Sequence, residues 1–100
     1  MNAFNITGEL TQELLAAGSG VRANKIFLTN IEGTNACTVD LYIEKKLSGK
    51  FYLLKGVTLP INAPLVYDLP EFSNQNQEFG LYIKLTKSAS ETPAVDVIIM

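Results

Sequence analysis

The sequence predicts an all-β protein: a single antiparallel β-sandwich, jelly-roll-like or immunoglobulin-like, of about eight short strands. Three observations support this fold class. Apolar and polar residues alternate with a period of two in several segments. Turn-forming residues separate these segments at intervals of roughly 8–12 residues. No stretch carries a convincing helical pattern, and a chain of 100 residues is expected to form one domain, so residues 1–100 are taken as a single β-sandwich domain.

The N-terminal part of the chain carries the weakest strand signals. The stretch AFNITGEL is compatible with a first strand at a sheet edge. The following TQELLAAGSG is compatible with a short helix over residues 11–17 that Gly18 would end, or with a strand over residues 13–16 followed by a glycine turn. We favour the strand, because the other segments are β and so short a helix is marginal in water.

The next two strands have well-defined faces. KIFLTN places Phe27 on the opposite side to its two apolar neighbours. The stretch IEGTNA, residues 31–36, has the glycine and asparagine content of a hairpin loop. In CTVDLYIEK every second residue from Cys37 to Ile43 is apolar, which predicts a strand with one buried face and with Tyr42 on the other face.

Glycine and proline divide the middle of the chain. Ser48 and Gly49 predict a tight turn into the strand KFYLLKG. Pro60 and Pro64 bracket a short segment, which indicates an edge strand or a bend at which the chain switches sheets. LVYDL then alternates as a brief strand, and the polar stretch PEFSNQNQE, residues 70–78, is a predicted loop.

Two more strands are predicted in the last part of the chain. FGLYIKLTK alternates in the same way as CTVDLYIEK and places Tyr82 on its polar face. The polar connection KSASETPA leads into the final segment, AVDVIIM, which has apolar residues in both phases. The phase expected to face the core is Val95, Val97 and Ile99, and the opposite phase includes Ile98 and Met100.

Composition argues against an enzyme. The chain has no histidine and one cysteine, Cys37, so it lacks the commonest general base and any disulfide or multi-cysteine metal site. It contains no phosphate-binding loop and no nucleophilic-serine motif. Outward carboxylates such as Asp40 and Glu44 are interpreted as a solvated strand face. We therefore expect no catalytic residue, no metal and no cofactor, and a buried Cys37.

Charge and hydropathy limit the partners. The net charge is −2 and the eight lysine and arginine residues are scattered, so direct nucleic-acid binding is not expected. No apolar run is long enough to cross a membrane. The first residues, MNAFNITGEL, have neither a basic region nor a long apolar region, so we expect the chain to be made in a cytoplasm or carried out of a cell by something larger.

The outward positions are unusually apolar and aromatic for a monomer. Tyrosine is a residue that association surfaces favour, and a contiguous exposed apolar patch usually marks a contact. One interpretation is that these side chains lie under loops or close the ends of the sandwich. The interpretation that we favour is a subunit interface, so that neighbouring protein covers the final strand. The predicted interface residues are Phe27, Tyr42, Tyr82, Ile98 and Met100.

From about Gly18 onward, the chain resembles a pattern found in small structural proteins of tailed-bacteriophage virions. SGVRANKIFLTNIEGTNACTVDLYIEKK has a glycine-containing turn, a strand ending in Thr-Asn, a small-residue loop and a Thr-Val-x-Leu-Tyr-Ile strand. LLKGVTLPINAPLVYDLP fits the same pattern, as does FGLYIKLTKSASETPAVDVIIM, which resembles a closing hairpin. The resemblance implies a β-sandwich subunit of a phage head, neck or tail, and it carries over no catalytic or ligand-binding residue.

The predicted function is therefore that of a non-enzymatic virion structural protein, most specifically a capsid decoration or cement subunit. Its expected partners are further copies of itself and other virion proteins, either capsid or portal and tail proteins. Its expected location is the virion, assembled in the host cytoplasm. A neck, tail or fibre-attachment protein is the alternative within this class. Alternatives from other classes are a carbohydrate-binding module, although the chain lacks tryptophan, and an accessory domain of an enzyme.

Overall fold

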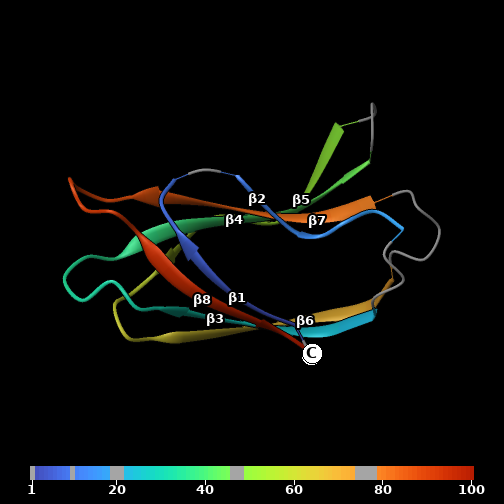
Figure 1. Cartoon of the computed structure of the whole chain (residues 1–100), viewed down its shortest axis with the longest axis horizontal. Coiled ribbons are helices and arrows are strands. Elements are labelled where there is room, and N and C mark those ends of the chain that lie inside the picture. Colours follow the sequence, from blue (N-terminus) through green and yellow to red (C-terminus); the bar gives the residue numbers. More distant parts are fainter. Residues whose placement is uncertain (1, 10, 19–21, 46–48, 74–78) are drawn as a thin grey trace.

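A computed structural model describes residues 2–9, 11–18, 22–45, 49–73 and 79–100 of the chain. The described part contains eight β-strands (Figure 1). In chain order they are β1 (Asn2–Thr7), β2 (Gln12–Leu15), β3 (Arg22–Asn30), β4 (Cys37–Lys45), β5 (Gly49–Leu59), β6 (Pro64–Ser73), β7 (Phe79–Lys87) and β8 (Ala94–Ile99). Within these residues there is no helix that could cross a membrane.

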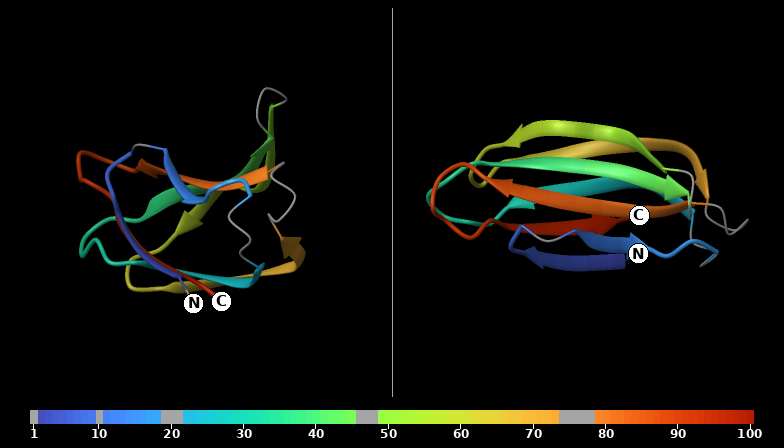
Figure 2. Two further views of the ribbon diagram at one scale, coloured as in Figure 1. Left: turned by 45° about the vertical axis from the view of Figure 1, so that its right-hand side comes forward. Right: turned by 90° about the horizontal axis from the view of Figure 1, so that it is seen from above.

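The strands form two antiparallel four-stranded sheets. One sheet has the order β1-β8-β3-β6 and the other has the order β2-β7-β4-β5. The sheets face each other as the two layers of a sandwich, and the two views of Figure 2 show them from different sides. Strands β1 and β8 pair with each other, so that the first and last strands lie side by side. The predicted all-β sandwich is confirmed.

The pairing of the strands follows a nested order. β4 pairs with β5, β3 with β6, β2 with β7 and β1 with β8. The chain is therefore one long antiparallel hairpin whose successive pairs alternate between the two sheets. The additional pairings β4–β7 and β3–β8 complete each sheet. Among the two predicted sandwich types, this is the order of a jelly roll.

The core lies between the sheets and consists of the inward phase of each alternating strand. These side chains are almost completely excluded from solvent, and each contributes about 1.5–3 kcal/mol through burial. The predicted inward phase of the last strand belongs to this core. Its central members are Ile26 and Leu28 on β3, Leu41 on β4, Ile83 on β7, and Val95, Val97 and Ile99 on β8.

The bend between the two prolines carries the chain from one sheet to the other. β5 ends at Leu59 in one sheet and β6 begins at Pro64 in the other, so the predicted sheet switch is confirmed. Both strands lie at sheet edges, where a proline that cannot donate a hydrogen bond does least damage. Strand β1 is also an edge strand, and the ambiguous segment after it forms strand β2 rather than a helix.

Three local predictions differ from the structure. Residues 31–36 do not close a hairpin, because β3 and β4 lie in different sheets. The connection from β7 to β8 also crosses between sheets rather than closing a hairpin. In both cases the composition marks a turn but carries no information on which sheet follows. Strand β6 continues to Ser73 through the start of the predicted polar loop, because an edge strand needs hydrogen bonds on one side only.

Other predicted features are only partly within the described residues. β4 and β5 form the expected hairpin, but Ser48 of its predicted turn lies outside the described residues. The remaining part of the predicted loop, residues 74–78, also lies outside them. Cys37 is buried, as predicted.

Candidate functional site

Four apolar side chains form a line across the outer face of the β1-β8-β3-β6 sheet. Ala3 on β1 lies opposite Ile98 on β8, Ile98 lies opposite Phe27 on β3, and Phe27 lies opposite Val66 on β6. We call these four residues the apolar row. It crosses all four strands because each pair is in direct register, so that cross-strand neighbours contact one another.

The apolar row is open to solvent. Val66 is 49% exposed and Ile98 is 37% exposed, whereas the inward neighbours of Ile98 on the same strand are buried. Ala3 is also exposed and Phe27 is partly exposed. Isolated exposed apolar residues are common, but a continuous line of them on one sheet face is typical of a contact surface.

Polar residues flank the apolar row on both sides. On one side, two residues along the strands from the apolar row, Lys25 on β3 lies opposite Asp68 on β6. The backbone of Lys25 is hydrogen-bonded to that of Met100 at 2.9–3.0 Å. In the other direction, the Asn5 side-chain amide donates to Asp96 Oδ1 at 2.6 Å. The face therefore has an apolar centre, with Lys25 and Asp68 on one flank and the carboxylate of Asp96 on the other.

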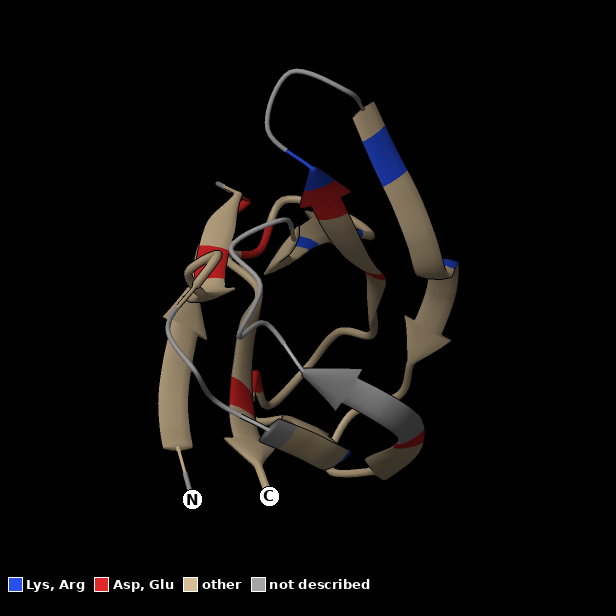
Figure 3. Cartoon of the chain, turned by 90° about the vertical axis from the view of Figure 1, so that its right-hand side faces the viewer, with Lys and Arg blue, Asp and Glu red and all other residues tan. Residues whose placement is uncertain are grey.

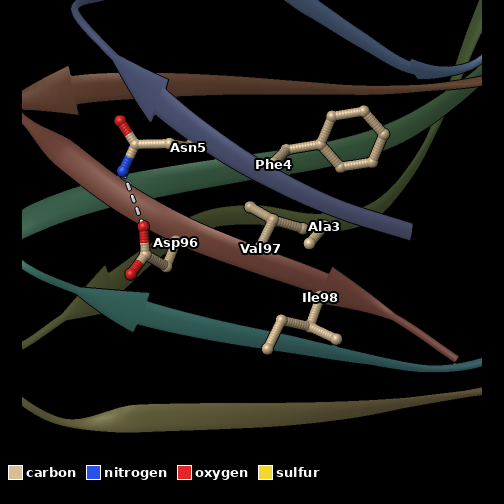
Figure 4. Close-up of a pocket in the computed structure, with 6 residues that line it drawn as sticks. All are labelled: Ala3, Phe4, Asn5, Asp96, Val97 and Ile98. Atoms are coloured by element: carbon tan, nitrogen blue, oxygen red, sulfur yellow. Dashed lines mark hydrogen bonds between the residues drawn. The ribbon is translucent and has the colours of Figure 1, made fainter. Parts of the chain in front are cut away.

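A shallow hollow of about 360 Å³ opens at the β1–β8 end of the apolar row (Figure 4). The hydrogen-bonded pair Asn5 and Asp96 borders it on one side, and Ala3 and Ile98 border it on the other. The small side chain of Ala3 leaves this space open. An apolar floor beside a carboxylate suits a long cationic side chain better than a neutral polar group.

The outer face of the second sheet carries a line of tyrosines. Tyr42 on β4 lies opposite Tyr52 on β5 and Tyr82 on β7. The centroids of the Tyr42 and Tyr52 rings are 5.3 Å apart, and those of Tyr42 and Tyr82 are 5.6 Å apart with their planes inclined by only 13°. We call these three residues the tyrosine row. Tyr42 lies on the outer face but is only 2% exposed, because its two neighbours enclose it.

Charged side chains contact each of the three tyrosines in the tyrosine row. Lys50 Nζ lies 4.9 Å from the centroid of the Tyr42 ring, and Lys55 Nζ lies 4.2 Å from that of Tyr52, both within the range of a cation–π interaction. The Tyr82 hydroxyl donates to Glu13 Oε2 at 3.1 Å. Burial raises the pKa of Tyr82, and the hydrogen bond to Glu13 adds to this. The three tyrosines are therefore engaged mainly with one another, with the two lysines and with Glu13.

The structure divides the predicted interface residues between the two outer faces. Phe27 and Ile98 lie directly opposite each other in the apolar row, and Met100, which is 53% exposed, lies two residues further along on the same face. Tyr42 and Tyr82 are stacked on each other on the other sheet. Their role in an interface stays a prediction for all five.

The sequence reasoning missed two members of these rows and left a third undecided. Val66 and Ala3 belong to strands whose alternation is short, so neither attracted attention as a surface residue. On β5, neighbouring positions require Phe51 or Tyr52 to point outward, and register shifts between Val39 and Tyr42 of the partner strand interrupt the alternation that would decide between them. A cross-strand pairing pattern would have found all three, but that pattern depends on the strand order.

Outside the two rows, the side chains that could carry chemistry are metal-ligand types, the thiol of Cys37 and scattered charges. The described residues include no group of three or more histidine, cysteine, aspartate or glutamate side chains that could hold a metal ion. Burial raises the pKa of the Cys37 thiol, and the charges of Glu91 and Glu32 add to this effect. In the end-on view of Figure 3, the described charged residues of both signs are spread over several strands and form no continuous stripe of one sign.

Comparisons with known proteins give a likeness of fold. No protein-family model matches the chain, and no curated protein matches it in sequence. Among solved structures, the chain is similar to the Yersinia pseudotuberculosis-derived mitogen, with a TM-score of 0.58 and 18% sequence identity. The match covers 99% of this chain and 85% of the mitogen chain. At this identity the likeness concerns the β-sandwich and carries no residue-level function.

Proposed function

We propose that this chain is a non-enzymatic structural subunit that assembles through the outer face of its β1-β8-β3-β6 sheet, and that it serves in the virion of a tailed phage as a capsid decoration or cement protein. The observation that carries the proposal is the apolar row, which crosses all four strands in register and is open to solvent. Modest contacts of this kind gain strength when a particle repeats them many times.

Two lines of support are independent of each other. The geometry of the apolar row supports assembly, whatever the particle. The phage setting rests on the resemblance of the sequence pattern from about Gly18 onward. The jelly roll is common among viral capsid proteins, but it also occurs in lectins, so the fold alone favours neither.

The carbohydrate-binding alternative is disfavoured by the geometry of the tyrosine row. A sugar stacks on the open face of an aromatic ring. The Tyr42 ring is enclosed between Tyr52 and Tyr82, and Lys55 lies over the ring of Tyr52. These rings are engaged with one another and with lysines. They therefore offer a sugar little free ring surface.

The proposal is tested with particles of the phage whose genome encodes this chain, prepared without it. The purified chain is added and co-sedimentation is measured for the wild type, Ile98→Lys and Thr86→Lys. The two variants add the same charge at an exposed strand position, but Thr86 lies on the other sheet. We expect Ile98→Lys to weaken binding at least about tenfold and Thr86→Lys to leave it unchanged.

Absence of wild-type binding, or equal binding by Ile98→Lys, would overturn the proposal. The number of copies per particle, counted by quantitative mass spectrometry of intact virions, separates the two alternatives within this class. Several hundred copies indicate decoration of the capsid surface. A small number that matches the rotational symmetry of a tail indicates a neck or tail protein instead.

A further inference from the structure

We propose that the partner of the apolar row is a second copy of this chain, related by a two-fold axis that runs along the row, so that Lys25 of each copy binds Asp96 of the other. The inference rests on the proposed use of this sheet face and deepens it by naming the occupant. Its basis is the distribution of charge on the two sides of the row.

The sheet face has three parallel lines of side chains. The apolar row is the central line. One flank contains Lys25, opposite Asp68, and the other contains Asp96, opposite Asn5 on one side and Thr29 on the other. Each flank lies roughly 7 Å from the centre, the distance of two residues along a strand.

A two-fold axis along the apolar row places each flank on the opposite flank of the second copy. Lys25 then faces Thr29 of the other copy, and Asp96 of that copy lies one strand away, about 4.8 Å to the side. Sheets that pack face to face are about 10 Å apart, a gap that a lysine and an aspartate side chain bridge together. The same axis packs the apolar row against itself.

One oxygen of Asp96 is available for this contact. Asp96 accepts the hydrogen bond from Asn5 through Oδ1, so its other oxygen, Oδ2, is the atom that we assign to Lys25 of the second copy. That lysine reaches Asp96 from its position over Thr29, on the β3 side.

A two-fold axis parallel to the strands covers the whole apolar row only if it runs through the middle of the row. That axis would place Lys25 over Met100 of the second copy, because these residues lie at the same level on neighbouring strands. A thioether offers no charge to the lysine. An axis between β3 and β6 would place Lys25 over Asp68 but would leave Ala3 and Ile98 uncovered. Among the axes that cover the whole apolar row, the charge pattern therefore selects the axis along the row, and symmetry makes the contact occur twice.

The area of this face predicts weak association. Three lines of side chains across four strands cover roughly 400 Å² of sheet, about half of the area that each partner contributes to a standard stable complex. We therefore expect a dimer that forms at high protein concentration and that gains strength inside a larger assembly.

The test is a charge exchange, measured by sedimentation equilibrium of the full chain from the low-micromolar to the millimolar range. Lys25→Asp and Asp96→Lys each place like charges against each other in the dimer, so each variant alone should weaken dimerisation at least about tenfold. Mixed in equal amounts, the two variants present opposite charges at both contacts and should form a heterodimer about as tight as the wild-type dimer. Circular dichroism and thermal unfolding check that each variant is folded.

Lys84→Asp is the control, because Lys84 is exposed on the other sheet, opposite Asp40. It should leave dimerisation unchanged. A wild-type chain that stays monomeric throughout, a single variant that dimerises like the wild type, or a mixture that does not recover would each overturn the inference. If the chain stays monomeric but Ile98→Lys still abolishes particle binding, this inference fails and the proposed function stands. If the charge exchange succeeds but the chain does not bind particles, this inference stands and the proposed function fails.

Discussion

Tyr42 and Tyr82 lie opposite each other on β4 and β7, and their rings stack with centroids 5.6 Å apart. On the other side of Tyr42, the ring of Tyr52 lies 5.3 Å away at a steeper angle. The three rings connect the strands β5, β4 and β7 across the solvent side of the sheet. The outer face of this sheet therefore contributes to stability as a second, aromatic layer of packing.

Truncating the central ring of the tyrosine row should destabilise the protein as strongly as a core substitution. We expect Tyr42→Ala to lower the free energy of unfolding by about 3 kcal/mol, because a nearly buried aromatic ring and two ring contacts are lost. Tyr52→Ala, at a position that is 42% exposed, should cost only about 1 kcal/mol. Urea unfolding measures both values. Equal losses would contradict the enclosed position of Tyr42.

The sequence predicted the phase of each strong strand but not the neighbours across strands. Alternation alone places Phe27 and Ile98 on outward faces, and it does the same for Tyr42 and Tyr82. It does not show that the first two residues pair with each other on one sheet and the last two on the other. That information lies in the strand order, which depends on how the whole chain packs.

Strand β5 illustrates the same limit at the level of one residue. Its pairing with β4 shifts register twice between Val39 and Tyr42, and Gly56 has a positive φ of 62°. The Gly56 amide donates to Asp40 Oδ1 at 2.6 Å, which fixes the irregularity. Each shift adds one residue to β5, so the alternation is inverted between the two shifts and is restored beyond the second, at Tyr52. A period-two pattern does not locate such shifts, so the sequence left open whether Phe51 or Tyr52 points outward.

Gly80 should resist substitution because the ring of Tyr82 occupies the space beside it. A Cβ atom at position 80 would lie 3.0 Å from Tyr82 Cε1 and 3.1 Å from the carbonyl oxygen of Leu15. We expect Gly80→Ala to lower the free energy of unfolding by about 1–3 kcal/mol through overpacking. Combining it with Tyr82→Ala should reduce this cost, since one of the two close contacts is then removed.

Gly33→Ala is the matched control for this prediction. A Cβ atom at Gly33 meets nothing within 4 Å. Its effect on the free energy of unfolding should stay within about 0.5 kcal/mol. If Gly80→Ala were equally mild, the close packing of Tyr82 over Gly80 would be wrong.

Asn30 should be the polar residue whose loss costs most among those described. Its side chain is completely buried and donates from Nδ2 to the carbonyl oxygens of Asn35 at 3.1 Å and Leu59 at 3.0 Å. Its Oδ1 accepts from the Glu32 amide at 2.9 Å. One side chain thus joins the end of β3, the following loop and the end of β5, and so connects the two sheets.

Replacing Asn30 with alanine leaves three backbone groups without this partner. We expect Asn30→Ala to lower the free energy of unfolding by about 3 kcal/mol, because unsatisfied buried groups are costly. Asn24→Ala, on the same strand but exposed, should change it by less than about 0.5 kcal/mol. Guanidinium unfolding of both variants gives the comparison. A mild Asn30→Ala would show that water replaces the lost hydrogen bonds.

The thiol of Cys37 should be protected in the folded protein. It is only 1% exposed, and burial raises its pKa, so little reactive thiolate is present near neutral pH. We expect an aromatic disulfide reagent at pH 8 to react at least about a hundredfold more slowly with the folded chain than with the chain in denaturant. Comparable rates would place Cys37 at the surface.

Two carboxylates should make the stability of the loops depend on acid. Glu32 accepts from the Thr34 hydroxyl at 2.9 Å and from the Asn35 amide at 2.6 Å, and these hydrogen bonds, that of the hydroxyl above all, lower its pKa. Glu91 accepts from the amides of Ser88 at 3.0 Å and Ala89 at 2.8 Å, and the Ser88 amide contributes most to lowering its pKa. Each carboxylate therefore holds a connection between sheets in its ionised form.

The direction of the pH dependence follows from these lowered pKa values. Near pH 4.5, the ordinary value for both groups, the unfolded chain binds more protons than the folded chain. Their contribution to stability is therefore fully present above that pH and is lost as the pH falls through the lower pKa values of the folded state. Thermal unfolding from pH 6 to pH 3 should show this loss.

Glu32→Gln and Glu91→Gln should each flatten the dependence of stability on pH in this range. Thr34→Val, which removes only the hydroxyl donor, should reproduce part of the Glu32→Gln effect. Variants that keep the full wild-type slope would show that other groups govern acid unfolding.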